Sequence, residues 1–286
     1  MIQKIGVAGA GTMGSGIALN AAQSGFKVIL FDTQTTGIEN AQKMIAKNVA
    51  FLESKVKITA QQAAIIHQNI QYTTNINDCI ADVIIEAIVE NMEVKTNLYQ
   101  QLAAINSNET ILASNTSSLS ISSLQKNIAT PQRVVGMHFF NPAHVMKLVE
   151  VVAGEQTDKT VVTTIYNLCI QLGKQPVICN DAPGFIVNRV ARHFYLEAMH
   201  MASTTPVSIA DIDALMENIG FKMGPFKLMD LIGMDINYAV SQSVYHAFND
   251  NPRFMPSPMQ AAKVAAGELG RKTGKGFYDY SLNTPS

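Results

Sequence analysis

The first 32 residues hold the feature that most constrains the fold of this chain, a glycine-rich turn between two apolar runs. Residues 2–8 form a short apolar run, and residues 9–14 read Gly-Ala-Gly-Thr-Met-Gly. Small and apolar residues then recur at helical spacing as far as Gly25, and a second apolar run, residues 26–31, ends in Asp32. A strand, a tight turn, a helix and a second strand in this order predict a β-α-β unit with parallel strands.

The spacing within that unit is typical of a dinucleotide site. Gly9 allows a sharp turn after the strand, Gly11 lets the backbone approach a pyrophosphate, and Gly14 permits close packing of helix on strand. Asp32 follows 21 residues after Gly11. Its carboxylate would accept hydrogen bonds from ribose hydroxyls and repel a 2′-phosphate, which favours NAD over NADP. The alternative is a purely structural turn with a solvated aspartate, and it is more plausible for Asp32 than for the glycines.

Composition narrows the class of protein. With 286 residues, of which 47% are hydrophobic, we expect about two domains with substantial cores. No apolar run approaches the roughly 18 residues of a membrane helix. Met1 leads directly into the first predicted strand, so we expect no targeting peptide and a cytoplasmic protein. A net charge of −1 gives no reason to expect nucleic acid or membrane as a partner. Three scattered cysteines predict free thiols in a reducing compartment: Cys79, Cys169 and Cys179.

A helical insertion follows the first unit. Residues from about 36 to 68 favour helix, with a break near Ile58, and Thr59 is placed to cap a second helix. We therefore predict an inserted helical hairpin. Its first arm carries Lys43, Lys47, Lys55 and Lys57. Such a run is either a solvated face or a basic arm that contacts an anionic, phosphate-bearing ligand, and charge alone favours the solvated face.

The remaining pattern predicts two domains. Strand-like runs alternate with helical ones, which predicts an α/β fold of the Rossmann type, with a doubly wound, mostly parallel sheet. We place the NAD-binding domain at residues 1–182 and an all-α C-terminal domain at residues 183–286, whose glycine-rich tail is expected to fold back onto the body. The expected strands are 82–87, 110–114, 134–138, 148–152 and 175–179, and the expected helices are 93–106, 159–172, 185–202, 208–218, 226–232, 235–249 and 258–267.

His138 is the strongest candidate for a general base. It ends a predicted strand at the sheet edge where ligands bind. Glu150 lies inside the apolar run 147–152, where an unpaired carboxylate would be unfavourable. Pairing the two would orient the imidazole and stabilise it after proton uptake. The alternative is a structural core histidine and a strand-edge acid. We favour the pair, because two misplaced polar groups with complementary needs are a better signal than either alone.

Two other polar positions have open interpretations. Residues 114–118 follow another strand end, and their hydroxyls would bind either a substrate oxygen or the nicotinamide ribose, or would simply cap a helix. Asn188 is polar within an apolar helix start, and it would either donate a hydrogen bond to a substrate carbonyl or have a structural role only. No metal site is predicted, because no carboxylate or cysteine completes a ligand set with the other histidines. Those histidines are interpreted as structural or solvated: His67, His144, His193, His200 and His246.

Taken together, these residues resemble the 3-hydroxyacyl-CoA dehydrogenase family, in its short bacterial 3-hydroxybutyryl-CoA type, from end to end. The motifs that carry the resemblance are residues 9–14 with Asp32, 86–91, 114–118, 138–142, 184–189, 223–226 with Asp230, and 272–277.

The resemblance implies NAD-dependent oxidation of a (3S)-3-hydroxyacyl-CoA, of short chain such as 3-hydroxybutyryl-CoA, to the 3-oxoacyl-CoA, and the reverse. It implies His138 as base with Glu150, and it implies that Ser117 and Asn188 bind the substrate. Lys55 would meet the CoA phosphates. An acyl-CoA substrate and a homodimer are the implied partners. The implied NAD-binding residues are Gly9, Gly11, Thr12, Met13, Gly14, Asp32, Glu90, Lys95, Ser117, Asn141 and Lys272.

The chain departs from the family pattern in its arm. Asn48 stands where mitochondrial-type members carry a serine that contacts CoA, and Lys55-Val56-Lys57 replaces a Lys-Gly-Lys turn. Chain length and pathway therefore stay open. One alternative is a 3-hydroxyacid dehydrogenase of the 6-phosphogluconate type, disfavoured because Gly184 stands where those enzymes carry a lysine, four residues before Asn188. The other is a non-catalytic NAD(H)-binding protein like a lens crystallin, which the full set of catalytic candidates disfavours.

Overall fold

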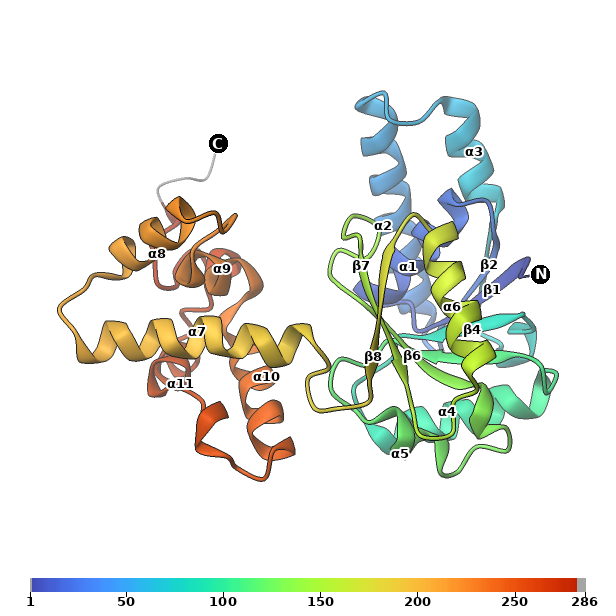
Figure 1. Ribbon diagram of the computed structural model, residues 1–286. Coiled ribbons are helices and arrows are strands. Elements are labelled where there is room, and N and C mark those ends of the chain that lie inside the picture. Colours follow the sequence, from blue (N-terminus) through green and yellow to red (C-terminus); the bar gives the residue numbers. More distant parts are fainter. Residues whose placement is uncertain (1, 282–286) are drawn as a thin grey trace. The chain divides into compact units, whose positions relative to one another are not determined.

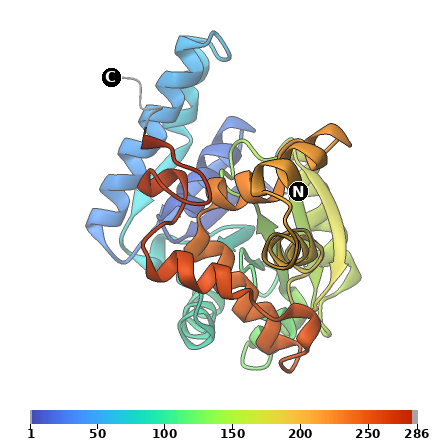
Figure 2. The same ribbon diagram turned by 90° about the vertical axis from the view of Figure 1, so that its left-hand side faces the viewer.

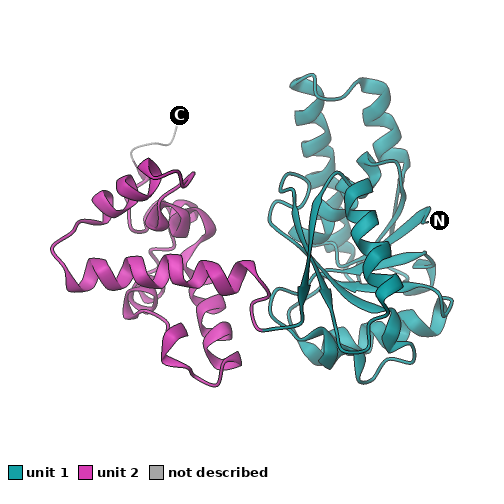
Figure 3. Ribbon diagram, viewed as in Figure 1, with its two compact units in different colours: residues 1–182 teal, residues 183–286 magenta. Residues whose placement is uncertain are grey.

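The structure is a computed structural model that describes residues 2–281. The chain divides into two compact units between Ala182 and Pro183, and each unit has a buried apolar core of its own (Figure 3). Unit 1 comprises residues 1–182 and unit 2 residues 183–286. Among the described residues, none of the helices is both long and apolar enough to cross a membrane.

Unit 1 is built on one eight-stranded sheet with the strand order β3-β2-β1-β4-β5-β6-β7-β8 (Figure 1). All neighbouring strands pair in parallel except β6 and β7, which are antiparallel. The predicted doubly wound, mostly parallel sheet is confirmed. The strands are β1 (Lys4–Ala8), β2 (Lys27–Phe31), β3 (Ile70–Thr73), β4 (Val83–Glu86), β5 (Ile111–Ser114), β6 (Val134–Phe139), β7 (Leu148–Ala153) and β8 (Gln175–Asn180).

Edge strand β3 was not predicted from the sequence. Its four residues include Gln71 and Thr73, and only Ile70 is buried. Because an edge strand can face solvent, it needs no apolar run, and the pattern that reveals buried strands is absent from it.

Helices cover both faces of the sheet. Alternate strand residues point to opposite faces, and on one face Ile5 and Val7 share an apolar cluster with residues of α1 (Thr12–Gln23) and α6 (Lys159–Gln171). The other face packs under α4 (Met92–Ile105) and the short α5 (Ile121–Gln125), which lie together in Figure 1. This division matters for the site, because the two faces carry different chemistry.

The inserted hairpin is also confirmed. Helices α2 (Thr35–Ser54) and α3 (Ala60–Gln68) run side by side and extend beyond the sheet (Figures 1 and 2). Thr59 caps α3 as predicted, since its hydroxyl accepts from the Gln62 N–H while the Gln62 side chain accepts from the Thr59 N–H. The four lysines of the arm are exposed.

Unit 2 is helical, as predicted, with a core that contains Tyr195, Met199, Phe226 and Met229. The backbone N–H groups of Phe277 and Tyr278 donate to the buried carboxylate of Asp230, so the glycine-rich tail folds back onto the unit. The helices are α7 (Val187–Thr204), α8 (Ile209–Asn218), α9 (Pro225–Ile232), α10 (Met234–Ala247) and α11 (Pro258–Ala265). Single 3₁₀ turns occur at Ile76–Asp78, Pro131–Arg133, Pro252–Phe254 and Arg271–Thr273.

All three cysteines are free and buried. Burial raises the pKa of each of these thiols to about 12. Cys79, Cys169 and Cys179 therefore remain protonated at neutral pH and behave as small apolar side chains.

Val56, at the end of α2, occupies a conformation that suits glycine. Its φ is +54°, its N–H donates to the Glu53 carbonyl, and the Lys57 N–H donates to the Leu52 carbonyl. This is the helix-ending turn in which a left-handed residue follows the last helical one. A β-branched residue is strained there.

We predict that Val56→Gly raises the free energy of unfolding by about 1 kcal/mol, because it removes the strain of a left-handed β-branched residue. The side chain is 90% exposed, so little packing is lost. Urea denaturation measures the change. Val56→Ala is the matched control, with a smaller gain expected since it keeps Cβ. A Gly variant less stable than the wild type would contradict the strained turn.

Candidate functional site

The glycines after β1 form a cradle that larger residues would block. Gly9 has a φ of +105°, and a Cβ on it would lie 2.6 Å from the Ala87 carbonyl oxygen. A Cβ on Gly14 would lie 1.7 Å from the Gly9 oxygen. Gly11 differs, because open space surrounds the position of its Cβ within 4 Å. Gly9 and Gly14 are thus required by packing, whereas Gly11 leaves room for a ligand against the backbone.

The start of α1 faces this open space. Gly11 is the N-cap of α1, and no side chain caps the helix. Thr12 and Met13 are its first two residues. The first N–H groups of a helix have no partner within the helix and favour an anion. A pyrophosphate fits the donors and the space at Gly11.

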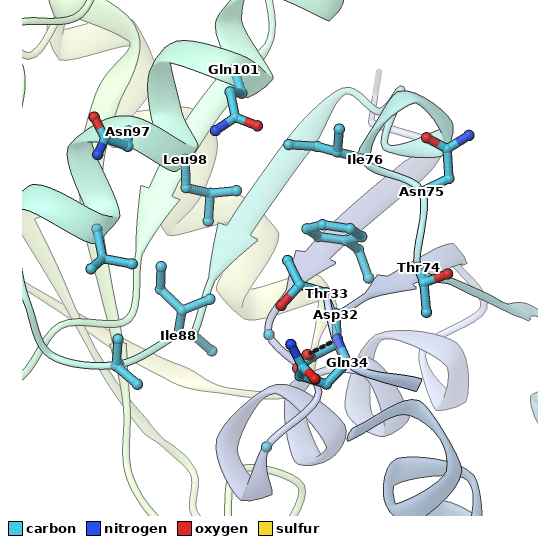
Figure 4. Close-up of a pocket in the computed structure, with 16 residues that line it drawn as sticks. Asp32, Thr33, Gln34, Thr74, Asn75, Ile76, Ile88, Asn97, Leu98 and Gln101 are labelled. Atoms are coloured by element: carbon cyan, nitrogen blue, oxygen red, sulfur yellow. Dashed lines mark hydrogen bonds between the residues drawn. The ribbon is translucent and has the colours of Figure 1, made fainter. Parts of the chain in front are cut away.

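A cavity of about 870 Å³ adjoins the cradle (Figure 4). Asp32, directly after β2, lines it together with Gly9 and Gly11. The two carboxylate oxygens of Asp32 accept hydrogen bonds from the Ala10 N–H at 2.8 Å and the Gln34 N–H at 2.9 Å, which fixes their orientation. Figure 4 shows the second bond as a dashed line.

The opposite wall of that cavity is largely apolar. Ile88 and Val89 follow β4, and Val94 and Leu98 belong to α4. A flat aromatic base fits between such side chains, and an acid for ribose hydroxyls stands beside the phosphate cradle. The residues present therefore fit the adenosine half of NAD.

Four polar side chains share the other face of the sheet. On β4 to β7 the residues that alternate with them, Ile85, Ala113, Met137 and Val149, belong to the apolar cluster under α1 and α6. The intervening positions therefore point toward the face of α4 and α5. Those positions are Glu86, Ser114, His138 and Glu150, all buried.

His138 and Glu150 face each other across the antiparallel pair β6–β7. The two residues are partners in the register, and the distance from His138 Nδ1 to Glu150 Oε2 is 2.8 Å. His138 is 6% exposed and Glu150 is 1% exposed. The Phe140 ring lies beside the imidazole, with centroids 4.6 Å apart. The structure thus brings together the two groups that the sequence analysis paired.

Glu90 organises the segment that follows β5. Its Oε1 atom accepts hydrogen bonds from the Thr116 hydroxyl at 2.6 Å and from the N–H groups of Ser117 and Ser118 at 3.0 and 3.1 Å. Burial alone would raise the pKa of Glu90, but the charge of Lys95 and these hydrogen bonds hold it below its usual value. The helix cap considered for residues 114–118 is supplied instead by Ser120, at the start of α5.

Glu86, the first residue of the motif 86–91, is a polar residue of this face that was not among the predicted site residues. It is fully buried at the end of β4 and forms an ion pair with Lys95. Its second oxygen accepts from the Ser114 hydroxyl at 2.8 Å. A charged residue that closes an otherwise apolar strand was the available signal.

The other predicted site residues are more dispersed. Asn141 is exposed, just after β6, and Lys55 is exposed at the end of α2 with its ammonium 5.8 Å from the centroid of the Phe51 ring. Asn188 and Lys272 belong to unit 2. Asn188 is the second residue of α7, and Lys272 forms an ion pair with Asp235 at 2.6 Å.

Comparison with known proteins assigns a family to this arrangement. The family model described as 3-hydroxyacyl-CoA dehydrogenase, NAD binding domain, matches residues 4–182, and the model of the C-terminal domain matches residues 184–280. This chain belongs to the 3-hydroxyacyl-CoA dehydrogenase family. The resemblance inferred from its motifs is therefore confirmed, and the cofactor for which the cradle is built is NAD.

Individual members of this family are similar to the chain over nearly its whole length. It is 44% identical to the 3-hydroxyadipyl-CoA dehydrogenase of Escherichia coli over 98% of its residues, but it spans only 59% of that protein. It is 39% identical to a probable 3-hydroxybutyryl-CoA dehydrogenase of Deinococcus radiodurans, with 97% of this chain and all of the relative covered. The solved (S)-3-hydroxybutyryl-CoA dehydrogenase of Ralstonia eutropha is 37% identical, with a TM-score of 0.93 over 98% of this chain and 99% of that one.

Two glycine substitutions separate packing from ligand access. We predict that Gly14→Ala lowers the free energy of unfolding by about 2 kcal/mol or more, because its Cβ collides with the Gly9 carbonyl. Gly11→Ala should lower it by less than about 1 kcal/mol, yet weaken NADH binding at least about tenfold by filling the ligand's space. For each variant, thermal unfolding measures the change in stability and fluorescence titration measures the affinity for NADH. Unchanged NADH affinity in a folded Gly11→Ala protein would place the pyrophosphate elsewhere.

Proposed function

We propose that this protein oxidises a short-chain (3S)-3-hydroxyacyl-CoA to the 3-oxoacyl-CoA with NAD⁺, and catalyses the reverse reduction. The observation that carries this proposal is the buried His138–Glu150 pair on the sheet that also holds the NAD cradle. The chemistry that NAD⁺ would supply at its site is a hydride acceptor for C3 of the substrate. The protein must then supply a group that takes the proton of the 3-hydroxyl.

The geometry of the pair suits His138 to that role. A carboxylate can only accept hydrogen bonds, so Nδ1 of His138 carries the proton shared with Glu150 at 2.8 Å. Nε2 of the neutral ring is then the basic nitrogen. Once it has taken the hydroxyl proton, the negative charge of Glu150 stabilises the imidazolium, and in the reverse reaction Nε2 returns the proton to the carbonyl oxygen.

The remaining contacts follow from the family pattern. We assign Ser117 and Asn188 to the reacting oxygen and the thioester side of the substrate, Lys55 to the CoA phosphates, and Asn141 and Lys272 to NAD. A homodimer in the cytoplasm is the corresponding expectation. The two domains at residues 1–182 and 183–286 would then divide cofactor binding from substrate binding and dimerisation.

The acyl chain length of the preferred substrate can be tested directly by an assay. Several relatives carry the name 3-hydroxybutyryl-CoA dehydrogenase, and one is named 3-hydroxyadipyl-CoA dehydrogenase, for a six-carbon dicarboxylic acyl group. The assay follows steady-state oxidation of NADH. It compares the kcat/KM values for acetoacetyl-CoA, for longer 3-oxoacyl-CoA thioesters and for 3-oxoadipyl-CoA. The highest kcat/KM with acetoacetyl-CoA supports the proposal. No turnover of any thioester would overturn it.

We predict that His138→Asn lowers kcat for acetoacetyl-CoA reduction by roughly 10²- to 10⁴-fold, the usual loss for a positioned acid–base group. NADH should bind as before, because the cradle is unaltered. The matched control is His246→Asn, since His246 also pairs with a carboxylate, Asp250, but is exposed in unit 2. Near-normal turnover of His138→Asn would remove the residue from the mechanism.

We predict that Asp32→Ala narrows the preference for NAD⁺ over NADP⁺, because the carboxylate no longer repels a 2′-phosphate. Its hydrogen bonds to the ribose are also lost, so kcat/KM with NAD⁺ should fall. The ratio of kcat/KM for the two cofactors is the measurement. A ratio equal to that of the wild type would show that Asp32 does not contact the ribose.

A further inference from the structure

Lys174 is a buried cation that the proposed chemistry does not use. It directly precedes β8 and is 7% exposed. None of the ion pairs within the described part of the chain includes it. A buried ammonium is stable only where its hydrogens are bonded. The ammonium of Lys174 donates to two backbone carbonyl oxygens, that of Ala143 at 2.6 Å and that of Met146 at 2.9 Å.

The two carbonyl groups belong to the loop between β6 and β7, residues 140–147. The loop makes one helical turn, in which the N–H groups of Val145 and Met146 both donate to the Pro142 carbonyl oxygen at 2.9 Å. The carbonyl groups at the end of a helical turn have no partner within it. The ammonium of Lys174 supplies that partner from outside the loop, and it therefore closes the turn.

Lys174 can hold the loop because its own backbone is fixed. Its N–H donates to the Cys169 carbonyl oxygen in α6 at 2.9 Å, and the next N–H, that of Gln175, donates to the Lys147 carbonyl oxygen at 2.8 Å. Gln175 begins β8 and pairs in parallel with Leu148, the first residue of β7. The ammonium thus reaches the loop from a position that α6 and the sheet both fix.

On its other side the loop packs against α1, the helix that begins at the NAD cradle. Ala143 is 2% exposed and belongs to the apolar cluster of unit 1. A Cβ on Gly16 of α1 would lie 3.2 Å from the Ala143 Cβ and 3.5 Å from the Ala143 nitrogen, so the helix and the loop approach closely. Ala143 is therefore held between α1 and the ammonium of Lys174. The position of the loop relative to the cradle depends on both contacts.

We propose that Lys174 is a positioning residue for the cofactor site: by closing the turn of the 140–147 loop against α1, it places Asn141 for contact with NAD. Asn141 is the second residue of this loop. The inference rests on the proposed function only for the contact between Asn141 and NAD. His138 and Glu150 do not need Lys174, because the pairing of β6 with β7 aligns them.

The test replaces Lys174 with an uncharged side chain of similar length, Lys174→Met. We expect the amides of Val145 and Met146 to exchange hydrogen about tenfold faster or more, because the turn is no longer closed. The Kd for NADH should rise about fivefold or more. Lys27→Met is the matched control, since Lys27 also donates to a neutral oxygen, that of the Asn69 side chain at 2.8 Å, but at the amino end of β2. It should change neither quantity.

A double-mutant cycle connects the effect to Asn141. Asn141→Ala should by itself weaken NADH binding about fivefold or more, because a contact with the cofactor is lost. If Lys174 acts by positioning Asn141, adding Lys174→Met to Asn141→Ala should raise the Kd for NADH by less than about twofold further. A purely structural role of Lys174 would weaken binding by the same factor in both backgrounds.

Unchanged exchange at Val145 and Met146 in a folded Lys174→Met protein would overturn the proposal, as would an effect on NADH binding that is fully additive with Asn141→Ala. An unchanged Kd for Asn141→Ala would overturn the contact between Asn141 and NAD, and the proposal with it. If Lys174→Met does not fold, Gly16→Ala displaces the same turn from the side of α1, and its effect on the Kd should likewise disappear in the Asn141→Ala background. If the wild type binds NADH but does not reduce acetoacetyl-CoA, the proposed function fails, whereas exchange and NADH affinity still decide the role of Lys174.

Discussion

The antiparallel pairing of β7 with β6 is the constraint on which the candidate site depends. It places Glu150 directly opposite His138 on a buried face of the sheet. A register shift of one residue would turn Glu150 to the other face, into the apolar cluster of Val149 and Val151. A buried carboxylate needs a donor and a general base needs an orienting acceptor. One hydrogen bond meets both requirements, so the stability of β7 and the proposed chemistry of β6 depend on the same contact.

The two faces of the sheet differ in composition because successive strand residues point to opposite faces. The face under α1 and α6 is continuously apolar and holds the unit together. The face toward α4 carries Glu86, Ser114, His138 and Glu150 on four successive strands. β4, β5 and β6 run parallel, so their carboxyl ends lie on the same side of the sheet. The polar groups near those ends lie on the side where Asp32 follows the carboxyl end of β2. The sheet topology thus brings these four polar side chains together on one face, while the apolar core occupies the other face.

The sequence alone predicted the features that depend on a local residue pattern or on a polar residue within an apolar run. The turn at Gly9–Gly14, the Thr59 cap and the His138–Glu150 contact were each readable from spacing or from polar residues inside apolar runs. Contacts that join distant segments were not readable. Glu90 bonds to residues 26 to 28 positions away, and nothing in the sequence around Lys95 signals its burial between two acids. The family resemblance places a turn at residues 55–57, but the left-handed conformation of Val56 could not be predicted from the sequence, because valine disfavours it.

The segment around Ser117 is held from a second side, at the point where the chain leaves unit 1. Asp181, two residues before the boundary at Pro183, accepts hydrogen bonds from the Ser120 hydroxyl and from the N–H groups of Ile121 and Ser122, at the start of α5. Helix α5 follows the Ser114–Ser118 loop directly. The loop therefore lies between Glu90 and Asp181, so that carboxylates from two other segments of unit 1 define its position. Charged acceptors from other segments thus add to the hydrogen bonds that the Ser114 and Thr116 hydroxyls accept from the loop's own backbone. A backbone fixed in this way would hold the Ser117 hydroxyl accurately for the contact proposed above.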